Sequence, residues 1–315
     1  MNIAILVPLT DDLLHQIRIA YPDAVIHTSK TLDQASDEML QCEILIAYNN
    51  QLQSIRLDEM KQLRWIQVFT AGVDNLPLND FEARSIRITT SSGAHKVPMA
   101  EFALGCMLQE VKQFIPLYEK QKQSSWYRKL PFDGLEGKTV SVLGAGKIGQ
   151  EIARRAKVFG MRTIGVNRTG RQVDGFDQLF VQSDVDQALE AADFVIAVTP
   201  LTPLTRQWLD ASKLGKMKPE AVFINLGRGE VVDEEALIHL LQHRLIKRAY
   251  LDVFQNEPLS ADSPFWSLDN CIITPHISAI SERYNERCLA IFLDNMKRYR
   301  EGQRLHNLVE ATIGY

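Results

Sequence analysis

The segment from Gly144 to Gly149 carries the most specific chemical signal in this sequence. Its residues, Gly-Ala-Gly-Lys-Ile-Gly, directly follow an apolar run of strand type. Gly144 permits a tight turn, Gly146 lets a pyrophosphate approach the backbone, and Gly149 allows a helix to pack closely on the strand. The free N–H groups and the positive dipole of that helix would hold the phosphates. We therefore expect a dinucleotide cofactor, bound by Gly144, Gly146, Lys147, Ile148 and Gly149. The alternative is a glycine-rich turn without a ligand.

Three residues with useful side chains, Arg228, Glu257 and His276, each stand shortly after a later apolar run. Arg228 is flanked by Gly227 and Gly229, and His276 completes the sequence Thr-Pro-His. In an open parallel sheet, ligands bind outside the carboxyl ends of the strands, which is also where the cofactor must lie. Taken singly, each residue could be an ordinary surface side chain. Together at one edge, they predict a reaction centre.

Apolar runs that alternate with amphipathic stretches would position these residues. From the glycine segment onward, we expect parallel strands at residues 140–143, 163–166, 194–198, 222–226, 249–253 and 271–274. Six strands with intervening helices match a complete doubly wound dinucleotide-binding domain. An earlier series has the same alternation and predicts a second α/β domain with a largely parallel sheet. Its strands are expected at residues 3–7, 25–27, 44–47, 65–69 and 86–90.

Two segments mark the boundary between these domains. Residues 91–98 are rich in turn formers and end at Pro98, which suits the first turn of a helix. The helix expected at 98–119 is apolar around most of its circumference, so it must be buried between domains, at a homodimer interface, or both. A charged helix at 281–299 is expected to return to the first domain. We therefore predict one domain from residues 1–97 and 284–315, and a second domain from residues 98–283.

The composition of the 315-residue chain is that of a globular protein, with 45% hydrophobic residues, 23% charged residues and a net charge of −4. This slight acidity, without a block of Lys and Arg, argues against a nucleic-acid partner. The start of the chain lacks the basic region of a signal peptide, and no run approaches the length of a membrane span. Four scattered cysteines without a C-x-x-C pair fit a reducing, cytoplasmic compartment.

Several motifs follow one another in a characteristic order and spacing. They are Thr70-Ala-Gly-Val-Asp74, the glycine segment, Pro200-Leu-Thr-Pro203, Asn225-Leu-Gly-Arg-Gly229, Leu251-Asp-Val-Phe254 with Glu257-Pro258, and Thr274-Pro-His276. In these motifs the chain resembles the D-isomer-specific 2-hydroxyacid dehydrogenase family. The resemblance implies two Rossmann-like doubly wound α/β domains, of which the first is a flavodoxin-like substrate domain and the second binds NAD(P).

The resemblance also implies a role for each candidate residue. Reduction of a 2-keto acid needs a hydride donor, a proton donor and groups that hold the anionic substrate. His276 matches the family's proton donor and Glu257 its partner, because a carboxylate favours the charged form of a neighbouring imidazole. Arg228 matches the residue that binds the substrate carboxylate and polarises the carbonyl. Backbone N–H groups of Ala71, Gly72 and Val73 would also bind the carboxylate. The matching cofactor contacts are Thr199, Pro200, Leu226, Gly227, Arg228, Asp252 and His276, with Asp252 at the nicotinamide amide.

One segment departs from the usual NAD pattern. An NAD site generally has an Asp or Glu at the end of the second strand of the nucleotide-binding domain, where it binds the ribose hydroxyls. Here that strand is followed by Asn167-Arg168-Thr169, and no acidic residue occurs before Asp174. Arg168 and Thr169 would bind a 2′-phosphate, which a carboxylate would repel. We therefore expect NADP(H) to be preferred, with NAD(H) possible.

Other interpretations of single residues stay open. Glu257 and His276 could be a structural pair, and Arg228 could form a loop salt bridge. His239 and His243 have a spacing that can bind zinc on a helix, but no third ligand accompanies them, so no metal site is predicted. His95, just before the boundary helix, could point toward the reaction centre.

The sequence thus predicts a homodimeric, NADPH-dependent reductase of small 2-keto acids, with glyoxylate or hydroxypyruvate as leading substrates. A phosphoglycerate dehydrogenase-like enzyme that uses NAD is the alternative within the family. A nucleotide-sensing regulatory protein is the alternative from another class. Such a sensor needs the glycine segment, but it does not need Arg228, Glu257 and His276 together.

Overall fold

The computed structural model describes residues 1–53, 55–70, 72–73 and 76–309. The chain divides into two compact units. Unit 1 comprises Met1–His95 and Ser281–Tyr315, and unit 2 comprises Lys96–Ile280. The sequence predicted both boundaries slightly later in the chain, after residues 97 and 283.

Unit 1 is built on five parallel strands in the order β2-β1-β3-β4-β5, which is the flavodoxin-like order. The strands are β1 (Asn2–Ile5), β2 (Val25–Thr28), β3 (Ile44–Ala47), β4 (Trp65–Val68) and β5 (Arg87–Thr90). The helices are α1 (Asp11–Ala20), α2 (Asp37–Leu40), α3 (Leu78–Ala83) and α10 (Tyr284–Arg300), with 3-10 turns η1 (Leu32–Gln34) and η2 (Asn49–Leu52).

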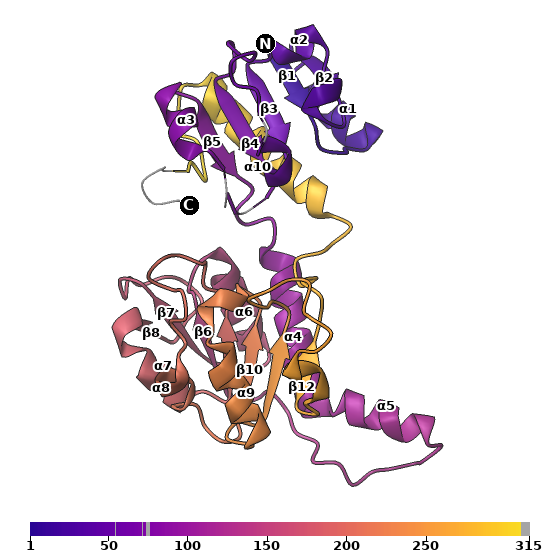
Figure 1. Cartoon of the computed structure of the whole chain (residues 1–315), viewed down its shortest axis with the longest axis vertical. Helices are drawn as coiled ribbons and strands as arrows, with labels where there is room; N and C mark the ends of the chain where they lie inside the picture. Colours follow the sequence, from indigo (N-terminus) through magenta and orange to yellow (C-terminus); the bar gives the residue numbers. More distant parts are fainter. Residues whose placement is uncertain (54, 71, 74–75, 310–315) are drawn as a thin grey trace. The chain divides into compact units, whose positions relative to one another are not determined.

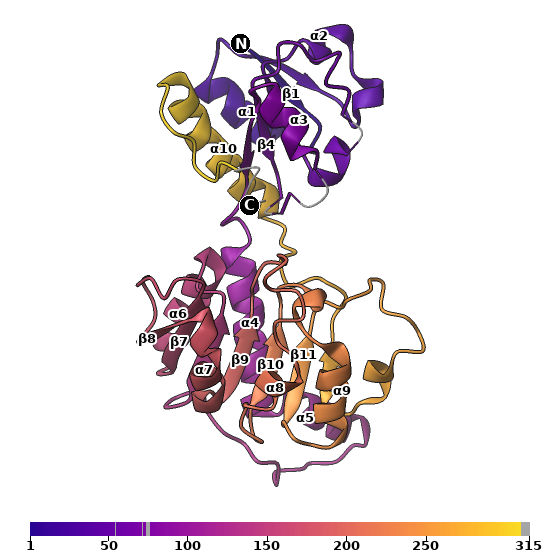
Figure 2. The same cartoon turned by 60° about the vertical axis from the view of Figure 1, so that its left-hand side comes forward.

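Side chains that alternate along the unit 1 strands form two buried apolar layers, one on each face of the sheet. Helices α1 and α10 cover one face, and α2 and α3 cover the other (Figure 2). The final helix therefore packs on strands that lie far from it in the sequence. Trp65 of β4 stacks on Phe292 and Tyr299 of α10, with ring centroids 5.3 Å apart in both pairs.

Unit 2 contains seven parallel strands in the order β12-β11-β10-β9-β6-β7-β8. The strands are β6 (Thr139–Leu143), β7 (Arg162–Asn167), β8 (Gln178–Val181), β9 (Phe194–Ala197), β10 (Val222–Asn225), β11 (Arg248–Leu251) and β12 (Cys271–Ile273). The sequence predicted six of them. It missed β8, because this short edge strand is only half-buried and lacks the continuous apolar run of a central strand.

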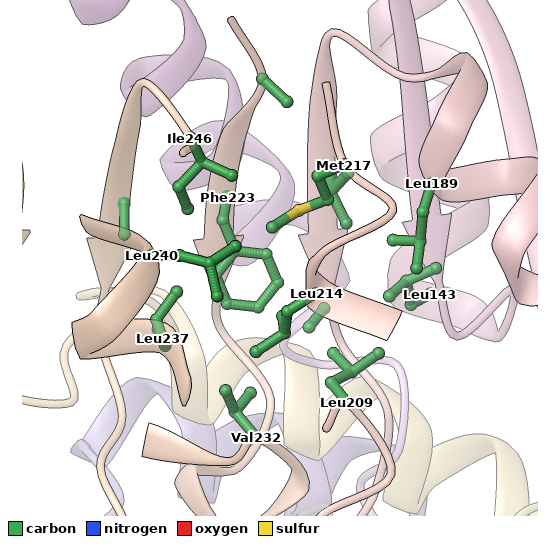
Figure 3. Packing of buried hydrophobic residues seen from close by; sticks show 14 of the residues in the cluster. Leu143, Leu189, Leu209, Leu214, Met217, Phe223, Val232, Leu237, Leu240 and Ile246 are labelled. Carbon is green, nitrogen blue, oxygen red and sulfur yellow. The ribbon is translucent and has the colours of Figure 1, made fainter. Parts of the chain in front are cut away.

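Helices cover both faces of the unit 2 sheet. They are α4 (Lys96–Lys112), α5 (Phe114–Lys122), α6 (Lys147–Val158), α7 (Val185–Ala191), α8 (Ala211–Leu214) and α9 (Glu234–Gln242), with 3-10 turns η3 (Gln182–Asp184), η4 (Gly229–Val231) and η5 (Pro264–Ser267). The core on the face of α7, α8 and α9 includes Leu189, Leu214, Phe223 and Leu240 (Figure 3). Helices α4 and α6 pack on the opposite face.

The prediction of a single helix at 98–119 is wrong, because the chain forms two helices, α4 and α5, with a break at Gln113. Gln113 has a left-handed backbone with a φ of 56°, and its Nε2 donates a hydrogen bond to the Glu110 carbonyl at 2.6 Å. This capping is usually performed by Gly or Asn, so the sequence held no signal for it. Helix α4 is buried within unit 2, whereas α5 has no buried residue and extends away from the sheet (Figure 1).

Candidate active site

The candidate residues of unit 2 follow strands that end together at one edge of the sheet. The ends of β10, β11 and β12 are in register, because Asn225 pairs with Leu251, and Leu251 pairs with Ile273. Asp252 directly follows β11, and His276 lies shortly after β12. The parallel topology therefore brings these segments to the edge where open α/β sheets bind ligands.

His276 and Glu257 form a hydrogen-bonded pair. The ring Nδ1 of His276 lies 2.8 Å from Oε2 of Glu257, and the two side chains are 48% and 36% exposed. The other carboxylate oxygen accepts a hydrogen bond from the backbone N–H of Phe254 at 3.1 Å. Because the carboxylate engages Nδ1, we assign the proton of the neutral ring to Nδ1 and leave Nε2 to exchange a proton with a ligand.

Asp252 holds the turn that carries His276. The Asp252 side chain is only 1% exposed, and its oxygens accept hydrogen bonds from the Thr274 hydroxyl at 2.6 Å and from the N–H groups of Ile277 and Ser278 at 2.9 Å each. Its backbone carbonyl accepts the N–H of His276 at 2.9 Å. His276 has a φ of 53°, a conformation that side chains with a Cβ rarely adopt unless the surroundings impose it. Asp252 therefore positions the histidine.

Arg228 stands in a turn that only glycine can flank. A Cβ on Gly229 would lie 1.9 Å from the carbonyl carbon of Phe254, so any other residue would clash with that backbone. Asn225, at the end of β10, donates to the Arg228 carbonyl at 3.3 Å and accepts the N–H of Gly227 at 3.2 Å. Backbone contacts on both sides thus fix the base of the arginine side chain.

The glycine segment has the geometry that a bound pyrophosphate needs. Gly144 has a φ of 115°, and a Cβ there would lie 2.8 Å from the Val198 carbonyl oxygen. A Cβ on Gly149 would lie 2.2 Å from the Gly144 oxygen, whereas one on Gly146 would meet nothing within 4 Å. Helix α6 begins directly after Gly146, which supplies no side-chain cap. Its first N–H groups and the open space at Gly146 fit a phosphate.

Two ammonium groups add to the attraction for an anion at this helix end. Burial and the neighbouring charge of Lys96 lower the pKa of Lys147, the first residue of α6. A positive charge at the positive end of a helix dipole is unfavourable by itself. A bound phosphate would offset the positive charges of Lys147 and Lys96, so the residues present fit an anionic dinucleotide.

The family model for the NAD-binding domain of D-isomer-specific 2-hydroxyacid dehydrogenases matches residues 104–278, which is more than half of the chain. The chain belongs to the D-isomer-specific 2-hydroxyacid dehydrogenase family. The matched range contains the glycine segment, Arg228, Glu257 and His276. As a member, this protein is an NAD(P)-dependent enzyme that acts on a small 2-hydroxy or 2-keto acid.

Curated relatives of the dehydrogenase include enzymes with two different names. A glyoxylate/hydroxypyruvate reductase B from Citrobacter koseri is 31% identical over 97% of this chain and 96% of its own length. A D-3-phosphoglycerate dehydrogenase from Methanocaldococcus jannaschii is 30% identical over 96% of this chain, but the match covers only 59% of that protein.

Solved structures confirm the fold class of two parallel-sheet α/β domains. A D-isomer-specific 2-hydroxyacid dehydrogenase family protein from Aeromonas salmonicida matches with a TM-score of 0.85 and 33% identity, over 98% of each chain. A D-isomer-specific 2-hydroxyacid dehydrogenase from Xanthobacter autotrophicus, in complex with NADPH and MES, matches with a TM-score of 0.82 and 26% identity, over 100% of this chain and 99% of that one.

The loop predicted to bind the substrate carboxylate belongs to unit 1 and follows β4. Of its residues, Ala71 lies outside the part of the chain that the structure describes. The hydroxyl of Thr70 donates to the Gly72 carbonyl at 2.9 Å, and Val73 is buried with 4% exposure. The contact between Thr70 and Gly72 therefore stabilises the start of the loop, at the carboxyl end of β4.

The turn after β7 is held by its own side chains. Asn167 donates to the Arg171 carbonyl at 2.8 Å and accepts the N–H of Thr169 at 3.1 Å. The Arg168 side chain is exposed. At the position where an NAD site generally has an acid, this dehydrogenase thus has an amide that builds the turn and presents an arginine.

Among the other predicted cofactor contacts, some are held by hydrogen bonds and some are buried in the core. The Thr199 hydroxyl donates to the Leu143 carbonyl at 2.8 Å, and the Pro200 carbonyl accepts the Thr205 hydroxyl at 2.7 Å. Leu226 is 2% exposed, and Ile148 packs partly buried against the core between α4 and α6. A ligand would meet Leu226 through its backbone.

Several polar residues that shape this edge were missed by sequence reasoning. Asn225 and Thr274 support Arg228 and Asp252, as described above. Glu234 accepts the N–H of Gln255 at 2.7 Å and so braces the segment that carries Glu257. Burial raises the pKa of the Glu234 carboxyl. The usable signal was a polar residue that ends or follows an otherwise apolar strand, because such a residue must find a partner.

His239 and His243 do not join the candidate site. Their rings stack at the end of α9 with centroids 4.2 Å apart, and Nδ1 of His243, the residue after the helix, lies 2.9 Å from the His239 carbonyl oxygen. Within the described ranges, no group of three or more His, Cys, Asp or Glu side chains could hold a metal ion. Over the same residues, no helix is both long enough and apolar enough to cross a membrane.

Proposed function

We propose that this dehydrogenase reduces a glyoxylate- or hydroxypyruvate-type 2-keto acid to the D-2-hydroxy acid with NADPH. The observation that carries the proposal is the His276–Glu257 pair, which follows strands at the same carboxyl edge of the unit 2 sheet as Arg228 and the glycine segment. The near-complete match to the Citrobacter koseri reductase supports this choice of substrate. The glycine segment would hold the dinucleotide phosphates, and the turns at Thr199 and Leu226 would border the nicotinamide.

The bound NADPH would supply a hydride to the carbonyl carbon. His276 donates its Nε2 proton to the carbonyl oxygen, which becomes the hydroxyl of the product, while Glu257 holds the ring through Nδ1. Arg228 binds the substrate carboxylate and polarises the carbonyl, a task that suits a planar guanidinium. For unit 1, the proposed carboxylate contacts are the N–H groups of Ala71, Gly72 and Val73, of which Ala71 lies outside the described residues.

A substrate panel tests this function. Glyoxylate and hydroxypyruvate are each offered with NADPH and NADH, and 3-phosphoglycerate is offered with NAD and NADP. We expect the highest kcat/KM for one of the two keto acids with NADPH. Best turnover of 3-phosphoglycerate with NAD would favour the alternative to which the Methanocaldococcus jannaschii relative points. Tight NADPH binding without turnover of any compound would favour a nucleotide sensor.

The preference for NADPH is proposed to depend on Arg168. Arg168→Ala should lower the kcat/KM advantage of NADPH over NADH by about 1.5–3 kcal/mol, which is the range for a hydrogen bond to a charged group. Arg162→Ala is the matched control, because Arg162 is an exposed arginine at the opposite end of the same strand. Equal or better use of NADH by the unmodified enzyme would contradict the assignment. The NADPH complex of the Xanthobacter autotrophicus structure supports it.

We also propose that the enzyme is a homodimer and that the partner subunit covers α5. This helix has 9 residues and none is buried, which is too short for a stable helix alone in water. Phe114, Tyr118 and Trp126 are exposed by 56%, 58% and 93%. Light scattering should give about twice the chain mass of 35.7 kDa, and Trp126→Ala with Tyr118→Ala should shift the protein toward monomer. A monomer of the unmodified enzyme at micromolar concentration would contradict the proposal.

We place the enzyme in the cytoplasm. Cys42, Cys106, Cys271 and Cys288 are buried free thiols. Burial raises the pKa of Cys106 and Cys271 to about 12, so these thiols stay protonated and unreactive. Free thiols are the usual state of cysteine in a reducing compartment.

A further inference from the structure

In unit 1, the residues next to both connections to unit 2 contact each other. His95 ends the first segment of unit 1, and Tyr284 lies close to the start of the second, at the beginning of α10. Their rings stack with centroids 4.8 Å apart and planes inclined by 21°. Nε2 of His95 lies 3.3 Å from the Tyr284 hydroxyl oxygen. We call this pair the clasp.

The clasp is hydrogen-bonded to the backbone that leads into the carboxylate-binding loop. The Tyr284 hydroxyl donates to the carbonyl oxygen of Phe69. Because a phenol has a single proton, His95 must be the donor in its contact with Tyr284, and its proton is assigned to Nε2. Burial raises the pKa of Tyr284, so the phenol stays protonated and keeps its donor role.

Phe69 is the last residue before this loop. It is fully buried, and its N–H donates to the Ala47 carbonyl at 2.8 Å. On the other side, the carbonyl of Thr70 accepts the N–H of Ser91 at 2.9 Å. Two successive carbonyls at the start of the loop are thus fixed, one by Tyr284 and one by the segment that ends at His95.

We propose that Tyr284, oriented by His95, is a positioning residue for the loop that contains Gly72 and Val73. Its hydroxyl fixes the Phe69 carbonyl and thereby the orientation of the peptide plane at which the loop begins. Neither side chain takes part in hydride or proton transfer. The consequence for catalysis rests on the proposed function of this loop, whereas the effect on loop rigidity does not.

Tyr284→Phe is the principal test, because it removes the hydroxyl and keeps the stacked ring. Amide hydrogen exchange at Thr70, Gly72 and Val73 should become faster. The KM for the keto acid should rise about 2- to 12-fold, which corresponds to the loss of one hydrogen bond, with kcat and NADPH affinity nearly unchanged. Tyr21→Phe is the matched control, because that phenol also donates to a backbone carbonyl, that of Leu293 in α10, at 3.2 Å.

Two variants of His95 distinguish the effect of its hydrogen bond from the effect of its stacked ring. His95→Gln keeps an N–H donor and should restore near-normal exchange and KM, whereas His95→Phe keeps only the stacking and should behave like Tyr284→Phe. Equal exchange rates in Tyr284→Phe and Tyr21→Phe would overturn the proposal. If amide exchange becomes faster in Tyr284→Phe while the unmodified enzyme reduces no 2-keto acid, the positioning role of the clasp is supported and the proposed function is contradicted.

Discussion

His276→Ala should lower kcat for keto-acid reduction by roughly 10²- to 10⁴-fold, the usual contribution of a positioned acid. NADPH affinity should stay nearly unchanged, because the glycine segment that would hold the phosphates is untouched. His243→Ala is the control, because it removes a histidine that faces solvent after α9. Steady-state kinetics and cofactor titration provide the two readouts.

Glu257→Gln tests the role of the pair. Reduction consumes the proton on Nε2 of His276, and the Glu257 carboxylate lies 2.8 Å from Nδ1 of the same ring. The neutral amide cannot attract the positive charge of the ring that donates this proton, so kcat should fall while NADPH affinity stays nearly unchanged. Near-normal kcat in Glu257→Gln or in His276→Ala would place the proton donor elsewhere.

Arg228→Lys should raise the KM for the keto acid by roughly 10- to 150-fold. An ammonium cannot reproduce the planar two-point contact with a carboxylate, and hydrogen bonds to charged groups contribute about 1.5–3 kcal/mol. The glycines on both sides of Arg228 should keep the turn intact in the variant, since the substitution leaves the backbone unchanged.

Arg244→Lys provides a matched control for this substitution. Nη2 of Arg244 lies 2.8 and 2.7 Å from the two carboxylate oxygens of Asp269, in an exposed pair outside the candidate site. The KM should therefore not change in Arg244→Lys. A normal KM in Arg228→Lys would show that the substrate carboxylate is bound by other groups.

Local patterns in the sequence were sufficient for the glycine segment and for the central strands. Gly144 has the positive φ of the predicted tight turn, and Gly149 has the predicted close approach of the helix to the strand, because a strand–turn–helix unit of this kind is determined over a few residues. The buried strands were predictable for a related reason. A central strand in a parallel sheet is covered on both faces and must be apolar throughout, as β3 is.

Only the tertiary structure decided how residues distant in the chain meet. Glu257 and His276 stand 19 positions apart, and their contact depends on the register of β11 with β12 and on the turn that Asp252 holds. The left-handed break at Gln113, the half-buried strand β8 and the stacking of His95 on Tyr284 likewise follow from packing partners elsewhere in the fold. Sequence determines such features only through the whole folded chain, because the hydrogen bonds and van der Waals contacts that select them come from other segments.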